Sequence, residues 1–358
     1  MRSPGLTRRD LLRGASLVAG AALGKVAMAG QTPPGSEMSM ESWLVMPDET
    51  EPKILEWQER HPELVHVDHV EQYCGRKTYA VTVSDESAPD AEKRKHIFSQ
   101  PHAHEPAPTA ACMNFINQLL ERRDLDGNAT QLDVDALLTR AVLSFIPDGN
   151  PDGRARSPER YWDGTKWSNE EFWKWMRGID AETGERFKRV DKWSTREDQP
   201  TRIGIVYEQI NEHEYVEPNR SWESSFFRLI HTLLERHDYD QLLDLHQTEF
   251  PNSPNNCMII LPVLQDELPR PIRATNAAWA QEIVDAWTAA GGRPRPEPRP
   301  LSYTGQQREY FVQRWGHIYR RMAKLTSEVQ NNNEATPPAE QRRLTEMAIR
   351  VSAERLLR

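Results

Sequence analysis

The sequence predicts an α/β protein, and its composition and periodicity both point to that class. The chain has 358 residues, of which 37% are hydrophobic, enough to bury a substantial core. Short apolar runs alternate along the chain with amphipathic segments of helical periodicity, as they do in α/β proteins. No internal repeat interrupts this order. We therefore expect strands and helices in alternation within one domain.

The apolar runs indicate where the strands lie. Strands are expected at 79–83, 96–99, 141–146, 203–207, 242–246, 257–263 and 324–329. Helices are expected at 109–123, 222–236, 276–289 and over the last twenty residues. The Pro- and Gly-rich segment 291–300 is expected to be a surface loop and not a domain boundary.

The N-terminus has the features of a cleaved export signal. "TRRDLLRG" (7–14) precedes a weakly apolar run and a small-x-small site at Ala27-Met28-Ala29, so we expect a signal peptide over 1–29. The Arg8-Arg9 pair resembles the twin-arginine type, which implies a periplasmic or extracellular mature protein. A single membrane anchor is the alternative, although the run is short and contains Lys25.

The charge and cysteine content exclude some functions. Without residues 1–29 the chain has 40 basic and 53 acidic side chains, a formal charge of −13, which disfavours nucleic acid as a partner. No later segment is apolar enough to span a membrane. The three cysteines are too few and too scattered for a disulfide framework or a thiolate zinc site, and at most one disulfide is expected.

One region is rich in tryptophan. Five of the eleven tryptophans lie between 162 and 193, within a segment expected to be an insertion at approximately 154–200. Tryptophan buries much apolar surface, so packing is the favoured interpretation over a ligand platform.

A cluster of histidines at "HAHE" (102–105) is the first candidate site. His102 and Glu105 are three residues apart just after an expected strand, so both can face one metal. His246, at the end of the expected strand 242–246, is the best candidate for a third ligand, because sites form at the carboxyl edge of such sheets. Two histidines and a carboxylate favour catalytic Zn²⁺, without excluding Co²⁺ or Mn²⁺.

Further motifs follow in order along the chain. They are "NPDG" (150–153), Asn219-Arg220, Asp244-Leu245-His246, Tyr303 in "LSYTG" and Glu328 in "LTSEV". Together with "HAHE", this series resembles the zinc metallocarboxypeptidase family of the carboxypeptidase A type, over roughly residues 50–335. The resemblance implies a mixed central β-sheet flanked by helices, in a single catalytic domain at 30–358.

The same resemblance implies the metal ligands and the base. His102, Glu105 and His246 would hold one Zn²⁺ per chain, and Glu328 would be the general base. His104 remains open, since an H-x-H pair can also share a metal or support it from outside.

Substrate contacts are also implied. Asn219 and Arg220 would bind the terminal carboxylate of the substrate, and Tyr303 would cap it. For the arginine that stabilises the oxyanion after "NPDG", Arg154, Arg156 and Arg160 are available, and Arg160 is the one we choose.

The expected function is that of an exported zinc carboxypeptidase, which hydrolyses the last peptide bond of a substrate with a free C-terminal carboxylate. An N-acyl amino acid deacylase of the same fold is one alternative, and a non-catalytic carboxypeptidase-like binding protein is another. The preferred terminal residue and the oligomeric state are not indicated by the sequence.

Overall fold

The computed structural model describes residues 39–358, which form one compact unit. The expected signal peptide at 1–29 lies outside these residues. The helices are α1 (Pro47–Arg60), α2 (Pro106–Glu121), α3 (Val134–Arg140), α4 (Pro151–Ala155), α5 (Asn169–Arg177), α6 (Ser225–Arg236), α7 (Arg270–Ala289), α8 (Gly305–Arg321) and α9 (Pro338–Arg355). The strands of the main sheet are β1 (Val65–Glu71), β2 (Lys77–Val83), β3 (Arg94–Ser99), β4 (Ala141–Ile146), β10 (Gln241–Thr248), β11 (Cys257–Ile260) and β12 (Ala323–Gln330).

The main sheet is mixed, as expected. Its order is β1-β2-β4-β3-β10-β12-β11. The four central strands β4, β3, β10 and β12 are parallel, and the outer strands pair antiparallel. The carboxyl ends of β3, β10 and β12 therefore lie side by side at one edge of the sheet.

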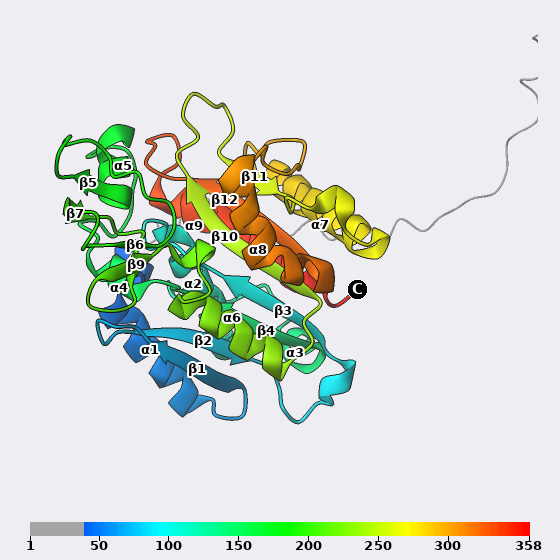
Figure 1. Cartoon of the computed structure of the whole chain (residues 1–358). Coiled ribbons are helices and arrows are strands. Elements are labelled where there is room, and N and C mark those ends of the chain that lie inside the picture. The colour runs from blue at the N-terminus through cyan, green and yellow to red at the C-terminus, as the bar shows by residue number, and fades with distance from the viewer. Residues whose placement is uncertain (1–38) are drawn as a thin grey trace, which may run out of the picture. The chain divides into compact units, whose positions relative to one another are not determined.

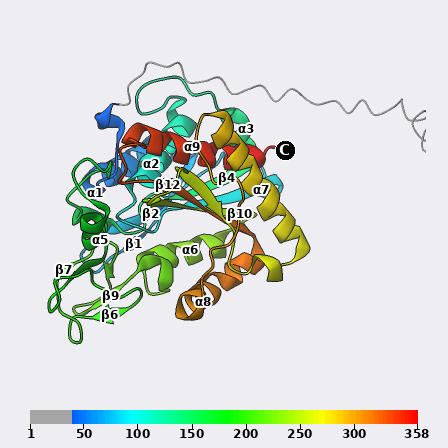
Figure 2. The same cartoon turned by 90° about the horizontal axis from the view of Figure 1, so that it is seen from above.

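Helices cover both faces of the sheet (Figure 1). Seen from above, α2, α7 and α9 lie on one side of the strands and α6 and α8 on the other (Figure 2). The larger core, which includes Leu243 and Leu245, packs against α2, α7 and α9. The opposite face of β10 contributes Leu242 to a second core with α6 and α8. Alternate residues of β10 thus serve different cores, as the two-residue period of a strand requires.

The tryptophan-rich region lies between α4 and α6. It contains α5, a two-stranded sheet of β5 (Gly178–Asp180) and β7 (Pro200–Ile203), and a three-stranded sheet of β6 (Trp193–Ser194), β8 (Glu208–Gln209) and β9 (Glu214–Val216). Trp162 and Trp193 are buried in two separate aromatic clusters. These tryptophans pack in the interior of the region, in agreement with the favoured interpretation.

One expected strand was wrong, and the strand expected at 257–263 was too long, since β11 ends at Ile260. The run 203–207 is not a strand: β7 ends at Ile203 and a turn follows. The chain turns there because Gly204 packs against the backbone of Arg177, where a Cβ would lie 2.2 Å from the carbonyl carbon. Elements that were not expected from the sequence include α1, α3, β1 and α8, of which α8 follows the Tyr303 loop directly.

Other features agree with expectation. Cys74, Cys112 and Cys257 are all unpaired. The segment 291–300 is a loop whose ends bridge to β11 at Cys257 and Ile260. Among residues 39–358, no helix combines the length and apolar character that a membrane crossing requires.

The main core can be tested at Leu243, which is fully buried on the α2, α7 and α9 face. Leu243→Ala should lower the free energy of unfolding by about 2–5 kcal/mol, because it leaves a cavity that the sheet cannot close. Leu55 on α1 is 45% exposed, and Leu55→Ala should change the free energy by about 0.5 kcal/mol or less. Urea unfolding measures both, and equal effects would contradict this core.

Candidate functional site

The expected metal ligands meet at the carboxyl edge of the central strands. The "HAHE" loop follows β3, and Glu105 stands directly before α2. In the parallel register of β10 and β12, His246 is the partner of Glu328. These side chains come from distant parts of the sequence and reach one another because three parallel strands end together.

Three side chains in this group are in direct contact. His102 Nδ1 lies 3.0 Å from Glu105 Oε1, and His246 Nδ1 lies 3.0 Å from Glu105 Oε2. The two Nδ1 atoms are 3.1 Å apart. Ligands around a tetrahedral Zn²⁺ stand at such separations, since each lies about 2.0–2.2 Å from the ion. Two nitrogens and a carboxylate converging in this way fit a zinc site.

The outer nitrogens of both histidines contact buried carboxylates. His102 Nε2 lies 2.6 Å from Glu217 Oε1, and His246 Nε2 lies 3.0 Å from Asp244 Oδ2. A histidine that donates its outer N–H to a carboxylate presents the other nitrogen as a lone pair, with its ring orientation fixed. Both rings are therefore set to offer Nδ1 to a metal.

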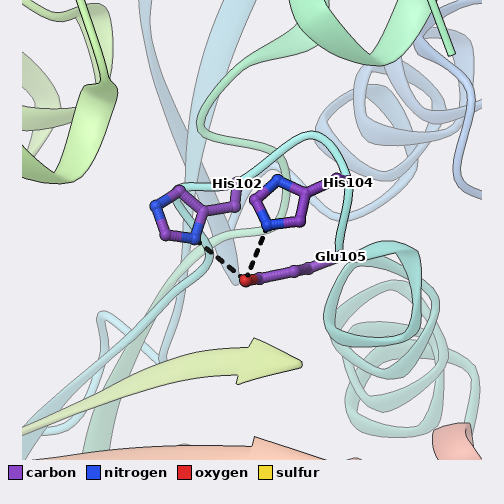
Figure 3. A group of neighbouring side chains, drawn as sticks. All are labelled: His102, His104 and Glu105. Atoms are coloured by element: carbon purple, nitrogen blue, oxygen red, sulfur yellow. Dashed lines mark hydrogen bonds and ion pairs between the residues drawn. The ribbon is translucent and has the colours of Figure 1, made fainter. Parts of the chain in front are cut away.

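His104 forms a second possible group with the same loop residues. Its Nε2 lies 3.2 Å from Glu105 Oε1, so that His102, His104 and Glu105 could also surround an ion (Figure 3). However, Nδ1 of His104 is buried and has no hydrogen-bond partner among residues 39–358. Burial lowers the pKa of His104 to about 4, so the ring is neutral at pH 7. Without an outer carboxylate, His104 lacks the support that His102 and His246 share.

The charges of the group reinforce one another. Burial opposes ionisation of Glu105, but His102, His246 and His104 lower its pKa well below the usual range. Burial likewise opposes the charge of His246, yet Asp244 and Glu105 raise its pKa. The pKa of His102 is raised in the same way by Glu105 and Glu217. This concentration of negative charge around two imidazoles favours a cation between them.

The "NPDG" motif holds the "HAHE" loop in place. Asn150 Oδ1 accepts a hydrogen bond from Gly153 N at 3.0 Å, and its Nδ2 donates to Val206 O at 3.1 Å. Gly153 is required because a Cβ there would lie 2.0 Å from Ile205 O and 2.8 Å from Ala103 Cβ. The motif thus packs against the "HAHE" loop and supports its position.

A cavity of about 220 Å³ opens over the ligands. Glu328 borders it, and its Oε2 is buried without a hydrogen-bond partner among the described residues. Burial raises the pKa of Glu328 to about 8, and Glu105 adds to this while His246 opposes it. A carboxylate with a raised pKa near metal-binding side chains is suited to proton transfer.

The expected substrate-binding residues also border this cavity. Arg220 Nη1 donates to Val190 O at 2.8 Å and lies 3.2 Å from Glu217 Oε2. Asn219 Oδ1 accepts a 2.8 Å hydrogen bond from Trp315 Nε1 on α8, which leaves its NH₂ group free to donate. Tyr303 stacks on Phe311, with ring centroids 5.1 Å apart. Asn219, Arg220 and Tyr303 therefore stand around one space with Glu328.

Arg160 is not brought to this cavity. It pairs with Glu49 and donates to Trp43 O at 2.8 Å, so it ties the start of the described chain to the tryptophan-rich region. Arg156 is bonded to Asp152 and to the carbonyl of Tyr207, and Arg154 is fully buried outside the cavity lining. The arginine that does border the cavity is Arg177, at the end of α5, whose Nη1 is buried without a partner among residues 39–358.

Several residues of the site were missed by sequence reasoning. Glu217 had a signal, since it stands two residues before the Asn219-Arg220 pair, where a short turn returns it to His102. Arg177 had no such signal, because it lies within the insertion, where the distance along the chain from "NPDG" does not indicate a role. Lys324, which also borders the cavity, lay inside an expected strand and was read only as part of it.

A second and larger cavity, of about 530 Å³, lies near the amino ends of β3 and β4. Its buried cation, Lys93, is already bonded to Ser84 Oγ at 2.8 Å and to the carbonyl of Asp85. Its lining also includes His66, His237, Glu86 and Asp90, but among residues 39–358 these do not form a converging ligand group like the one at 102–105.

Solved structures with a similar fold are carboxypeptidases. Carboxypeptidase A from Helicoverpa armigera is 15% identical, with a TM-score of 0.55 over 90% of this chain and 75% of that one. Bovine thrombin-activatable fibrinolysis inhibitor, solved with a tick carboxypeptidase inhibitor, is 15% identical, with a TM-score of 0.54 over 89% and 99%. A metallo-carboxypeptidase from Pseudomonas aeruginosa is 16% identical, with a TM-score of 0.51 over 85% and 68%. At these identities the likeness establishes the fold.

Family membership rests on a separate comparison. No curated protein sequence matches this chain. The family model described as zinc carboxypeptidase matches residues 53–257, which is more than half of the chain and contains the "HAHE", "NPDG", Asn219-Arg220 and His246 positions. The chain therefore belongs to the zinc carboxypeptidase family.

Proposed function

We propose that this protein is an exported, zinc-dependent carboxypeptidase that removes the last residue of a peptide. The observation that carries the proposal is the contact of His102, Glu105 and His246, with outer carboxylates on both rings and Glu328 beside them. Export rests on the Arg8-Arg9 segment and the small-residue site that follows it.

The ligand set we propose is His102, Glu105 and His246, with His104 outside it. When bound, Zn²⁺ supplies acidification of a water molecule and polarisation of the scissile carbonyl. Asp244 and Glu217 hold the ligand rings in the required orientation.

Glu328 is the proposed general base. It takes a proton from the attacking water and delivers it to the nitrogen of the departing amino acid. Its Oε2 is buried, and among residues 39–358 no hydrogen-bond donor occupies that atom. Arg177 replaces Arg160 as the proposed residue facing the developing oxyanion, because Arg177 borders the cavity with an unused donor.

Arg220 and Asn219 are proposed to bind the terminal carboxylate. Glu217 contacts both Arg220 and His102, so one buried carboxylate fixes the distance between the carboxylate-binding group and the metal ligands. Although burial alone would raise it, the pKa of Glu217 is lowered to about 2 by Arg220 and His102, so this carboxylate stays charged at pH 7. That fixed spacing favours cleavage one residue from the end. An N-acyl amino acid has the same carboxylate beside its scissile amide, so the pair also fits the deacylase alternative.

The ligand assignment is tested by zinc content. His102→Ala and His246→Ala should each lose most bound zinc, since two ligands hold the ion poorly. His104→Ala should keep about one zinc per chain. Elemental analysis after dialysis against a weak chelator measures all three variants. Loss of zinc from His104→Ala together with retention in His246→Ala would assign the site to the other group.

The role of Glu328 is tested by Glu328→Gln. Turnover should fall by at least about 100-fold, because the general base is gone, while zinc content stays unchanged. The raised pKa gives a second readout. When the pKa of a carboxyl group is higher in the folded than in the unfolded state, the protein becomes less stable as pH rises from 4.5 to about 8. Metal-free Glu328→Gln should therefore melt above wild type at pH 9 and near it at pH 4. Normal turnover would refute the assignment.

The role of Arg220 is tested with paired substrates that end in a free acid or an amide. Arg220→Met should lower kcat/KM for the free acid by about 100-fold, the loss of a charge-assisted pair. It should leave the slow amide reaction nearly unchanged. Arg228 on the outer face of α6 is exposed, and Arg228→Met serves as the control. Equal cleavage of acid and amide by wild type would contradict carboxylate recognition.

A further inference from the structure

Lys324 is a buried cation at the side of the candidate active-site cavity. It lies on β12, its residue is 3% exposed, and it borders the cavity. Its Nζ donates to Thr326 Oγ1 at 2.6 Å and to Asp244 Oδ2 at 3.2 Å. An ammonium has three N–H donors, so these contacts leave one. A buried lysine is unusual and needs a specific role.

The strand relates Lys324 to the proposed general base. Residues 324, 326 and 328 alternate with the core residues of β12 and therefore share one face of the sheet. Four residues of strand span roughly 13 Å. The cavity that borders Glu328 thus continues along β12 past Thr326 to Lys324.

The walls on this side of the cavity are mainly apolar. Ile260, Leu261 and Val263 follow from β11, and Phe311 and Tyr319 project from α8. The ring of Trp315 packs against Lys324, with Nζ 4.6 Å from its centroid, and fixes the side chain from behind. The polar groups on this side include Lys324, Thr326 and the hydroxyl of Tyr319.

Lys324 is more than a counter-ion for Asp244. The Asp244 carboxylate also accepts from Ser99 Oγ at 2.8 Å and contacts His246 Nε2 at 3.0 Å. Its charge is therefore shared between an imidazole and the ammonium, and Lys324 Nζ keeps one N–H that no hydrogen bond among the described residues uses. Two other cations border the cavity, Arg177 and Arg220, and each already has a different role in the proposed function.

We propose that Lys324 makes this site selective for peptides whose last residue has a carboxylate side chain, with glutamate preferred over aspartate. This rests on the proposed function, because it places the terminal residue in the pocket along β12. Glutamate is favoured because its longer side chain reaches farther down the strand. Thr326 donates its hydroxyl hydrogen to the same carboxylate when Lys324 occupies the lone pair of Thr326 Oγ1.

The first experiment compares three N-blocked dipeptides that end in Glu, Gln or Leu. Wild type should hydrolyse the Glu peptide with a kcat/KM at least about tenfold above the other two. Lys324→Met keeps the length of the side chain and its packing on Trp315 but removes the charge. It should lower kcat/KM for the Glu peptide by about 10- to 100-fold, and for the Gln and Leu peptides by less than about threefold.

Two controls separate recognition from structure. Lys324→Arg should retain the preference for Glu. Lys93, 7% exposed at the other end of the sheet, is a matched buried lysine, and Lys93→Met should leave the preference unchanged. Zinc content is measured for every variant. A wild type that prefers Leu, or a Lys324→Met protein that loses activity equally on all three peptides while keeping zinc, would overturn the proposal.

A binding measurement keeps this inference distinct from the proposed function. If wild type cleaves none of the peptides, peptidase function fails, and calorimetric titration with N-acetyl-L-glutamate and N-acetyl-L-leucine decides about Lys324. Tighter binding of N-acetyl-L-glutamate by wild type, with loss of the difference in Lys324→Met, would support an acid-selective pocket. Equal binding of both ligands by wild type would refute it.

Discussion

The Asp244 carboxylate is the contact on which the site depends most. It is 1% exposed and joins three central strands, through Ser99 on β3, its own strand β10, and Lys324 on β12. Although burial opposes it, the charges of Lys324 and His246 lower the pKa of Asp244 below its usual range, so it remains ionised. The same oxygen atoms orient the His246 ring and hold the Lys324 ammonium. One buried charge therefore contacts both His246, a proposed metal ligand, and Lys324 at the border of the cavity.

The part of the site that could be predicted from sequence is the part fixed by short-range geometry. His102 and Glu105 lie on one loop after a clear apolar run, and His246 ends another. Parallel strands with apolar runs of this kind end at a common edge, so their terminal side chains meet. The mixed sheet was expected because the series of motifs resembles a known family, and the family match confirms it. The sequence left the role of His104 open; in the structure the His102 and His246 rings contact the outer carboxylates Glu217 and Asp244, whereas Nδ1 of His104 has no partner among residues 39–358.

The errors came from segments where tertiary contacts override local pattern. The run 203–207 has strand-like residues, but Gly204 turns the chain against Arg177. Helix α8 has apolar residues at helical spacing, Phe311, Trp315 and Ile318, yet its many charged and polar residues between them masked the pattern. Arg160 was chosen among the three arginines that follow "NPDG", whereas in the structure it is Arg177, at the end of α5, that borders the cavity. In an inserted region, distance along the chain carries little information about distance in space.

The alternation of β12 has a consequence for how this strand can change over evolutionary time. Glu328 and Lys324 lie on the same face of one strand, with Thr326 between them. An insertion or deletion of a single residue between 324 and 328 would turn one of the two away from the cavity, because the side-chain period is two. New specificity can therefore arise here by substitution but not by a change in strand length. This part of the chain is expected to vary in residue type among descendants while its length stays fixed.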